Sequence, residues 1–151
     1  MKQPGFFREA APPPDTITAN IDGGARGNPG PAAYGVVVRD SKGKVITELG
    51  AYLGLQTNNF AEYSGLLAAL EYAQKENLPA LQVFSDSELL VKQMKGLYKV
   101  KSPGLVPLFE RARSLSRRLQ YFSIEHVRRE RNREADRMVN QVLDQKERNP
   151  R

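Results

Sequence analysis

The 151-residue chain contains no cysteine, no tryptophan and a single histidine, His126. Without cysteine it forms no disulfide and no thiolate zinc site, so any metal ion must be held by oxygen atoms or by that one imidazole. No apolar run reaches the length that spans a membrane, and the first fifteen residues lack the uninterrupted apolar stretch of a secretory signal. We therefore expect a cytoplasmic protein that does not bind a membrane.

The charged residues are abundant and unequal in number. Lysine and arginine total 23 against 17 aspartates and glutamates, which leaves a net charge of +6. Such a balance favours an anionic partner such as nucleic acid, although a merely well-solvated surface gives the same count. Hydrophobic residues make up 40% of the chain, which suits one globular domain. We expect that domain at 16–145, between flexible tails at 1–15 and 146–151.

Stretches rich in β-branched residues alternate with stretches that have apolar residues at helical spacing. The expected strands are 16–22, 32–40, 44–54, 80–86 and 121–127. The expected helices are 58–79, 87–96, 105–119 and 131–145, with Asn58 or Asn59, Ser87 and Asn132 at the N-termini of the first, second and last. The first three strands form an antiparallel meander. This order predicts an α/β fold with a mixed five-stranded sheet and helices on both faces.

Two acids stand at the ends of expected strands. The first strand ends in Asp22 and the fourth ends in Asp86. Ligands of such sheets gather beyond the carboxyl ends of parallel strands, where the strand order reverses. If these two strands are neighbours, Asp22 and Asp86 meet in that crevice.

Two further acids stand near the starts of expected helices. Glu62 falls in the first turn of the long helix, and Asp136 falls in the first turn of the last helix. Either acid alone is ordinary, because carboxylates stabilise helix N-termini by roughly 0.3–1 kcal/mol. Four clustered carboxylates would repel one another, however, unless protons or hard cations neutralised them. Magnesium, which prefers oxygen ligands, fits such a cluster.

The acids lie in four stretches of sequence: IDGGARGNPGPAAYGVVV, LQTNNFAEYSGLLAAL, VFSDSELLVKQMKGLYKVK and HVRRERNREADRMVN. Together these stretches resemble the type 1 ribonuclease H family over residues 16–143. The D-E-D-D acids of that family match Asp22, Glu62, Asp86 and Asp136. The resemblance implies a metal-dependent endonuclease that cleaves the RNA strand of RNA/DNA hybrids, and a monomer that requires no protein partner.

The same resemblance implies how the acids share the metal ions. Two Mg²⁺ ions, or Mn²⁺ in their place, stand about 4 Å apart in such a mechanism. Asp22 would bridge both ions, and Asp136 would complete the ion on the side of the attacking water. Glu62 and Asp86 would hold the ion on the side of the leaving group.

Residues that read the hybrid are also implied by the resemblance. A protein distinguishes RNA from DNA by the 2′-hydroxyl, which both donates and accepts hydrogen bonds. The residues expected to contact substrate are the asparagines Asn28, Asn58 and Asn59, the phosphate-binding Thr57, and the backbone of Gly23, Gly24 and Ala25. For Asn58 and Asn59, simple capping of the following helix remains an alternative.

The sequence departs from the family pattern in three places. Glu88 stands where many relatives have an amide, so its contact with the 2′-hydroxyl is in doubt. The basic protrusion of many bacterial relatives is absent, and Lys95, Lys99 and Lys101 are candidates to contact phosphate in its place, with a solvated lysine turn as the alternative. The loop before the last helix lacks the family histidine, and we expect His126, within a strand, to have a packing or sheet-surface role.

Two other functions remain open at this stage. A DNA-cutting nuclease of the transposase and integrase kind shares the acids but lacks the GNPG and TNN elements. A non-catalytic module that binds hybrids or double-stranded RNA would need no complete acid set, and this chain has all four.

Overall fold

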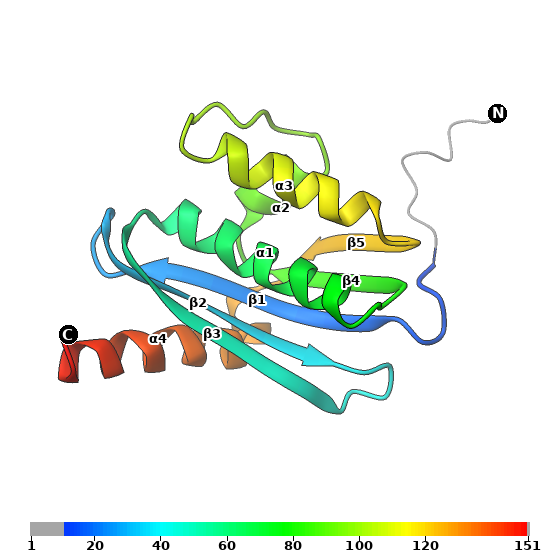
Figure 1. Cartoon of the computed structure of the whole chain (residues 1–151), viewed down its shortest axis with the longest axis horizontal. Coiled ribbons are helices and arrows are strands. Elements are labelled where there is room, and N and C mark those ends of the chain that lie inside the picture. The colour runs from blue at the N-terminus through cyan, green and yellow to red at the C-terminus, as the bar shows by residue number, and fades with distance from the viewer. Residues whose placement is uncertain (1–10, 151) are drawn as a thin grey trace.

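The structure, a computed structural model, describes residues 11–150 and contains one five-stranded sheet covered by helices on both faces (Figure 1). The strands are β1 (Ile17–Ala25), β2 (Gly30–Arg39), β3 (Val45–Gln56), β4 (Ala80–Ser85) and β5 (Tyr121–His126). The helices are α1 (Asn58–Lys75), α2 (Glu88–Met94), α3 (Val106–Arg117) and α4 (Arg133–Arg148), with a short 3₁₀ helix, η2 (Arg129–Arg131), before α4. The predicted elements are confirmed in type and order.

The sheet has the strand order β3-β2-β1-β4-β5. The first three strands pair antiparallel, as the predicted meander requires, whereas β4 pairs parallel with both β1 and β5. In the parallel β1–β4 pair, Ile21 lies opposite Ser85. The residue that follows each of these in the chain is an acid, so the pairing register itself brings Asp22 and Asp86 together.

The hydrophobic core is divided by the sheet into two parts. Helices α1 and α3 lie on one face and α4 lies on the other (Figure 1). The larger part contains Ile21, Val83 and Leu66, all fully buried, and the smaller part contains Val139 of α4. Each fully buried side chain of this size contributes roughly 1.5–3 kcal/mol to folding. Helices α1 and α4 are thereby held against opposite faces of β1.

Two glycines let the helices come very close to the sheet. A Cβ atom on Gly23 would lie 2.2 Å from the backbone carbonyl carbon of Ala61 in α1. A Cβ atom on Gly35 would lie 2.6 Å from the carbonyl oxygen of Ala135 in α4. Because no side chain larger than hydrogen fits at either place, both positions require glycine. Ala61 and Ala135 directly precede Glu62 and Asp136, and Gly35 of β2 pairs with Asp22, so the close packing brings both acids near Asp22.

The start of α1 differs from the prediction. Thr57 is the N-cap, and its hydroxyl accepts a hydrogen bond from the backbone N–H of Phe60 at 3.1 Å. The expected cap at Asn58 or Asn59 was therefore wrong, because both residues already belong to the helix. Glu62 consequently lies in the second turn of α1, where the helix dipole does little to stabilise its charge.

Helix α4 also differs from the prediction at both ends. Asn132 precedes the helix, but its side chain makes no capping hydrogen bond. Instead it is buried, donates to the carbonyl oxygen of Ile21 at 2.8 Å and accepts from Asn20 at 3.1 Å. The helix continues to Arg148, so the predicted C-terminal tail does not begin at residue 146.

The last predicted boundary is that between the N-terminal tail and the domain. The predicted tail at 1–15 lies outside the described residues as far as position 10, and residues 11–15 are exposed. Between residues 11 and 150, no helix combines the length and the apolar character needed to cross a bilayer.

Candidate active site

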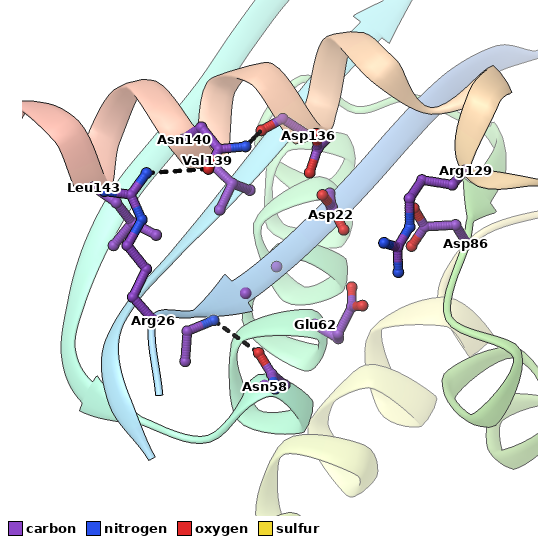
Figure 2. A pocket seen from close by; sticks show the side chains of 13 residues that line it. Asp22, Arg26, Asn58, Glu62, Asp86, Arg129, Asp136, Val139, Asn140 and Leu143 are labelled. Atoms are coloured by element: carbon purple, nitrogen blue, oxygen red, sulfur yellow. Dashed lines mark hydrogen bonds between the residues drawn. The ribbon is translucent and has the colours of Figure 1, made fainter. Parts of the chain in front are cut away.

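Three carboxylates converge near the carboxyl ends of β1 and β4. Asp22 comes from β1, Asp86 follows β4, and Glu62 projects from α1 (Figure 2). One oxygen atom from each lies within 4.8 Å of the others. This spacing suits a cation that binds carboxylate oxygen atoms, and nitrogen and sulfur ligands are absent from the group.

Asp136 approaches the group from the other side of the sheet. It lies in the first turn of α4, as predicted, and Figure 2 shows its carboxylate turned toward Asp22. It is not one of the three acids that lie within 4.8 Å of one another. Of the three acids, Asp22 is the one that Asp136 approaches.

Burial and mutual repulsion disfavour negative charge at this site. Burial of Asp22, which is 7% exposed, together with the charges of Asp86 and Asp136, raises its pKa from 3.8 to about 8. Burial and the charges of Asp22 and Asp86 raise the pKa of Glu62 well above its ordinary value. The N–H of Gly23 lowers both pKa values, but the opposing effects are larger. Asp22 consequently retains a proton near neutral pH unless a cation replaces it.

One oxygen atom of the Glu62 carboxylate, Oε1, also lacks a hydrogen-bond partner among the described residues, and this atom is buried. A buried polar oxygen without a partner costs about 1–3 kcal/mol. A divalent cation at this position would satisfy the oxygen atom, and the cluster is therefore suited to divalent metal binding.

The acids lie in an open pocket of about 390 Å³. Its lining consists of Asp22, Gly23, Gly24, Ala25, Arg26, Asn58, Glu62, Asp86, Arg129, Asp136, Val139, Asn140 and Leu143. Sequence reasoning missed Arg26 and Asn140, which carry no local signal of a site. Arg129 was visible only as part of a basic run, and its charge lowers the pKa of Glu62.

The predicted asparagines form a connected pair beside the pocket. The Oδ1 atom of Asn28 accepts from the backbone N–H of Asn58 at 3.0 Å. The Oδ1 atom of Asn58 accepts in turn from the N–H of Ala25 at 2.8 Å. Asn59 is exposed next to them at the start of α1. Since the N–H of Ala25 is already used by Asn58, Ala25 is a support for the asparagine pair.

The other predicted contacts lie outside the pocket lining. Glu88 forms an ion pair with Lys92 at 3.2 Å within α2. Lys99 and Lys101 are exposed on the segment between α2 and α3. The carbonyl oxygen of Lys99 accepts a 3.4 Å hydrogen bond from Gln93, which helps to fix that segment.

His126 is the last residue of β5, where it pairs with Ser85, and it is exposed. It does not line the pocket. The strand position agrees with the sequence prediction, and of the two expected roles the exposed side chain fits the sheet-surface role and not the packing role.

Comparison with known proteins identifies the family. A family model described as reverse transcriptase-like matches residues 20–142. The bifunctional protein Rv2228c of Mycobacterium tuberculosis is 43% identical over 129 residues, which make up 85% of this chain and 35% of that protein. Ribonuclease HI of Halobacterium salinarum is 41% identical over 128 residues, or 85% of this chain and 64% of that protein. This chain belongs to the ribonuclease H family.

Solved ribonuclease H structures share the fold. The N-terminal RNase H domain of Rv2228c, solved as a fusion with maltose-binding protein, matches with a TM-score of 0.86 at 40% identity, covering 91% of this chain and 99% of that chain. LC11-RNase H1, isolated from compost by a metagenomic approach and solved in complex with an RNA/DNA hybrid, matches with a TM-score of 0.81 at 43% identity, covering 86% and 98%. The predicted ribonuclease H fold is thus confirmed, although the chain spans only about a third of the full Mycobacterium relative.

Proposed function

We propose that this ribonuclease H family member is a metal-dependent endonuclease that hydrolyses the RNA strand of RNA/DNA hybrids. The observation that carries the proposal is the convergence of Asp22, Glu62 and Asp86 within 4.8 Å, at a site where burial disfavours the charges of Asp22 and Glu62. The name of the Halobacterium relative supports the reaction, and the hybrid bound to LC11-RNase H1 supports the substrate. All four acids come from one chain, which is consistent with an active monomer.

Magnesium, or manganese in its place, is the cofactor that the donor set supports. Asp22, Glu62 and Asp86 would hold one ion, and Asp136 would hold a second ion together with Asp22. Bound ions of this kind supply an activated water and stabilise the charge of the leaving 3′-oxygen. Because Asp22 keeps a proton near neutral pH in the metal-free site, cation binding should release that proton.

The asparagine pair is suited to recognise the 2′-hydroxyl of the RNA strand. The oxygen atoms of Asn28 and Asn58 are both occupied by backbone N–H groups, so each side chain presents its NH₂ group to substrate. A 2′-hydroxyl accepts such a hydrogen bond, whereas the DNA strand has no hydroxyl at this position. Discrimination between RNA and DNA would follow from this difference.

Phosphate contacts would extend the interface beyond the acids. The hydroxyl of Thr57 accepts from Phe60 and therefore keeps its own O–H free to donate to a phosphate oxygen. The exposed Lys99 and Lys101 would add charge-dependent contacts farther along the hybrid. Glu88 is a weaker candidate because its carboxylate is paired with Lys92 and repels phosphate.

Cleavage of labelled duplexes tests this proposal. The purified chain is incubated with end-labelled RNA/DNA, RNA/RNA and DNA/DNA duplexes of the same sequence, with magnesium or with a chelator. We expect internal cuts in the RNA strand of the hybrid only, and only with magnesium. Cleavage of DNA would instead support the transposase-like alternative, and hybrid binding without cleavage would support a non-catalytic module. Either result would refute the proposal.

A further inference from the structure

Arg26 connects two segments that line the pocket and are far apart in sequence, the end of β1 and helix α4. Its guanidinium forms ion pairs with Asp144 at 2.7 Å and with Glu147 at 2.6 Å, both on α4. It also donates to the Oδ1 atom of Asn140 at 3.1 Å (Figure 2). A single side chain at the end of β1 therefore has three acceptors on the helix that carries Asp136.

The backbone of Arg26 belongs to the tight loop that carries Asn28. Its N–H donates to the carbonyl oxygen of Pro31 at 2.9 Å and so closes the loop. A Cβ atom on Gly30 would lie 2.1 Å from the carbonyl oxygen of Arg26, so the two ends of the loop pack without space between them. Because the loop is this compact, a restraint on Arg26 also restrains Asn28 two residues later.

The helix side of the contact lies close to the acids. Asn140, which accepts from Arg26, donates through Nδ2 to the carbonyl oxygen of Asp136 at 3.2 Å. Asp136, Asn140 and Asp144 follow one another at intervals of four residues and share one face of α4. The contacts of Arg26 thus run along the helix face that points Asp136 at Asp22.

We propose that Arg26 is a positioning residue that fixes the loop bearing Asn28 relative to the helix bearing Asp136. The asparagine that would read the RNA strand and the acid that would hold a metal ion then stay at a fixed distance from each other. This inference rests on the proposed nuclease function. The three charged side chains are partly exposed, at 34% for Arg26, 51% for Asp144 and 61% for Glu147. Surface ion pairs of this kind add little to folding stability, so their principal effect is on geometry.

The obvious rival role is direct contact between Arg26 and a substrate phosphate. The two roles differ in what the acidic partners do. If Arg26 positions the loop relative to α4, then Asp144 and Glu147 are required, since they hold the guanidinium on α4. If Arg26 binds phosphate, these acids compete with substrate, and their removal should preserve or improve hybrid binding.

The experiment compares four variants with wild type: Arg26→Ala, Arg26→Lys, the double variant Asp144→Asn/Glu147→Gln, and Arg148→Ala as a matched loss of charge at the exposed end of α4. Melting temperature, kcat, KM and the salt dependence of KM are measured on RNA/DNA hybrid. We expect Arg26→Ala and the double variant to lose about tenfold in kcat, since misplacement by about 1 Å can cost up to 100-fold. Arg26→Lys, which retains one charged contact, should fall between them and wild type. Arg148→Ala should match wild type.

Two readouts separate positioning from the other roles. Positioning leaves the slope of log KM against log salt unchanged, whereas loss of a phosphate contact lowers that slope by about 1. Melting temperatures should stay within about 4 °C of wild type. Wild-type kcat in both Arg26→Ala and the double variant, or a loss confined to Arg26→Ala with a lower salt slope, would overturn the inference.

Hydrogen exchange in the metal-free protein tests the same contact without catalysis. In Arg26→Ala, the amides of 25–30 and 136–144 should exchange faster, while those in the middle of α1 keep their wild-type rates. If wild type failed to cleave hybrids, the proposed function would be lost, but faster exchange would still show that Arg26 ties the loop to α4. Unchanged exchange beside an active wild-type enzyme would remove the positioning role alone.

Discussion

Replacement of Asp22 by asparagine should stabilise the metal-free protein, and the gain should grow with pH. The pKa of Asp22 is about 8 in the folded protein against 3.8 as its ordinary value, because of burial and the neighbouring charges of Asp86 and Asp136. Between these two pH values, the folded protein therefore binds more protons than the unfolded chain. The free energy of unfolding falls as pH rises through this interval, and asparagine removes this dependence.

The size of the effect follows from the same two pKa values. A difference of about four pKa units corresponds to about 5 kcal/mol of unfolding free energy at pH 8. Water entry and local rearrangement reduce such a cost in real proteins, so we expect about 2–5 kcal/mol. For a domain of this length, that range is a difference of about 5–15 °C in melting temperature. Near pH 4 the difference should be small.

Thermal unfolding in a chelator from pH 4 to pH 9 measures this difference directly. The control is Asp15→Asn, which removes one exposed carboxylate just ahead of β1 and should follow wild type throughout. Added magnesium should raise the melting temperature of wild type more than that of Asp22→Asn, because the variant lacks a ligand. Parallel loss of stability in wild type and Asp22→Asn between pH 4 and pH 8 would refute the argument.

Four further results are expected. Asp86→Asn should keep the fold and hybrid binding but abolish cleavage in magnesium, and near wild-type turnover in the labelled-duplex assay would contradict the proposed site. Gly23→Ala should cost more than 2 kcal/mol in urea unfolding, because its Cβ would lie 2.2 Å from the backbone of Ala61. Lys99→Ala should lower the slope of log K against log salt by about 1 without altering RNA preference. His126→Ala should keep cleavage within about tenfold of wild type, whereas loss of a general base typically costs about 100-fold or more.

The positions of Asp22 and Asp86 could be predicted from the sequence. Buried strands have a recognisable apolar pattern, and an acid near the end of such a strand lies toward its carboxyl end. The predicted first strand was too short, since β1 runs three residues past Asp22 to Ala25. Parallel neighbours bring these ends to the same edge, and the β1–β4 pairing confirms this arrangement. Ser87 likewise caps α2 as predicted, by accepting from the N–H of Leu90 at 3.2 Å, since capping depends on residues within one turn.

Other polar side chains had several partners of similar quality, and local sequence could not rank them. Thr57, Asn58 and Asn59 are all competent caps, and Thr57 takes the role because Asn58 is engaged by the backbone of Ala25. Asn132 precedes α4 but bonds to Ile21, which lies 111 residues earlier in the chain. The contacts of Arg26 with α4 span even larger separations in sequence.

The sequence alone therefore determined the elements, their order and the strand-end acids, because these follow from periodicity and capping over a few residues. The tertiary structure decided which polar groups meet across the pocket. Gly23 and Gly35 show the physical reason, since the helices that carry Glu62 and Asp136 approach β1 and β2 this closely only where a missing Cβ permits contact between backbones. Such contacts depend on the packed positions of segments distant in sequence, and only the folded chain establishes them.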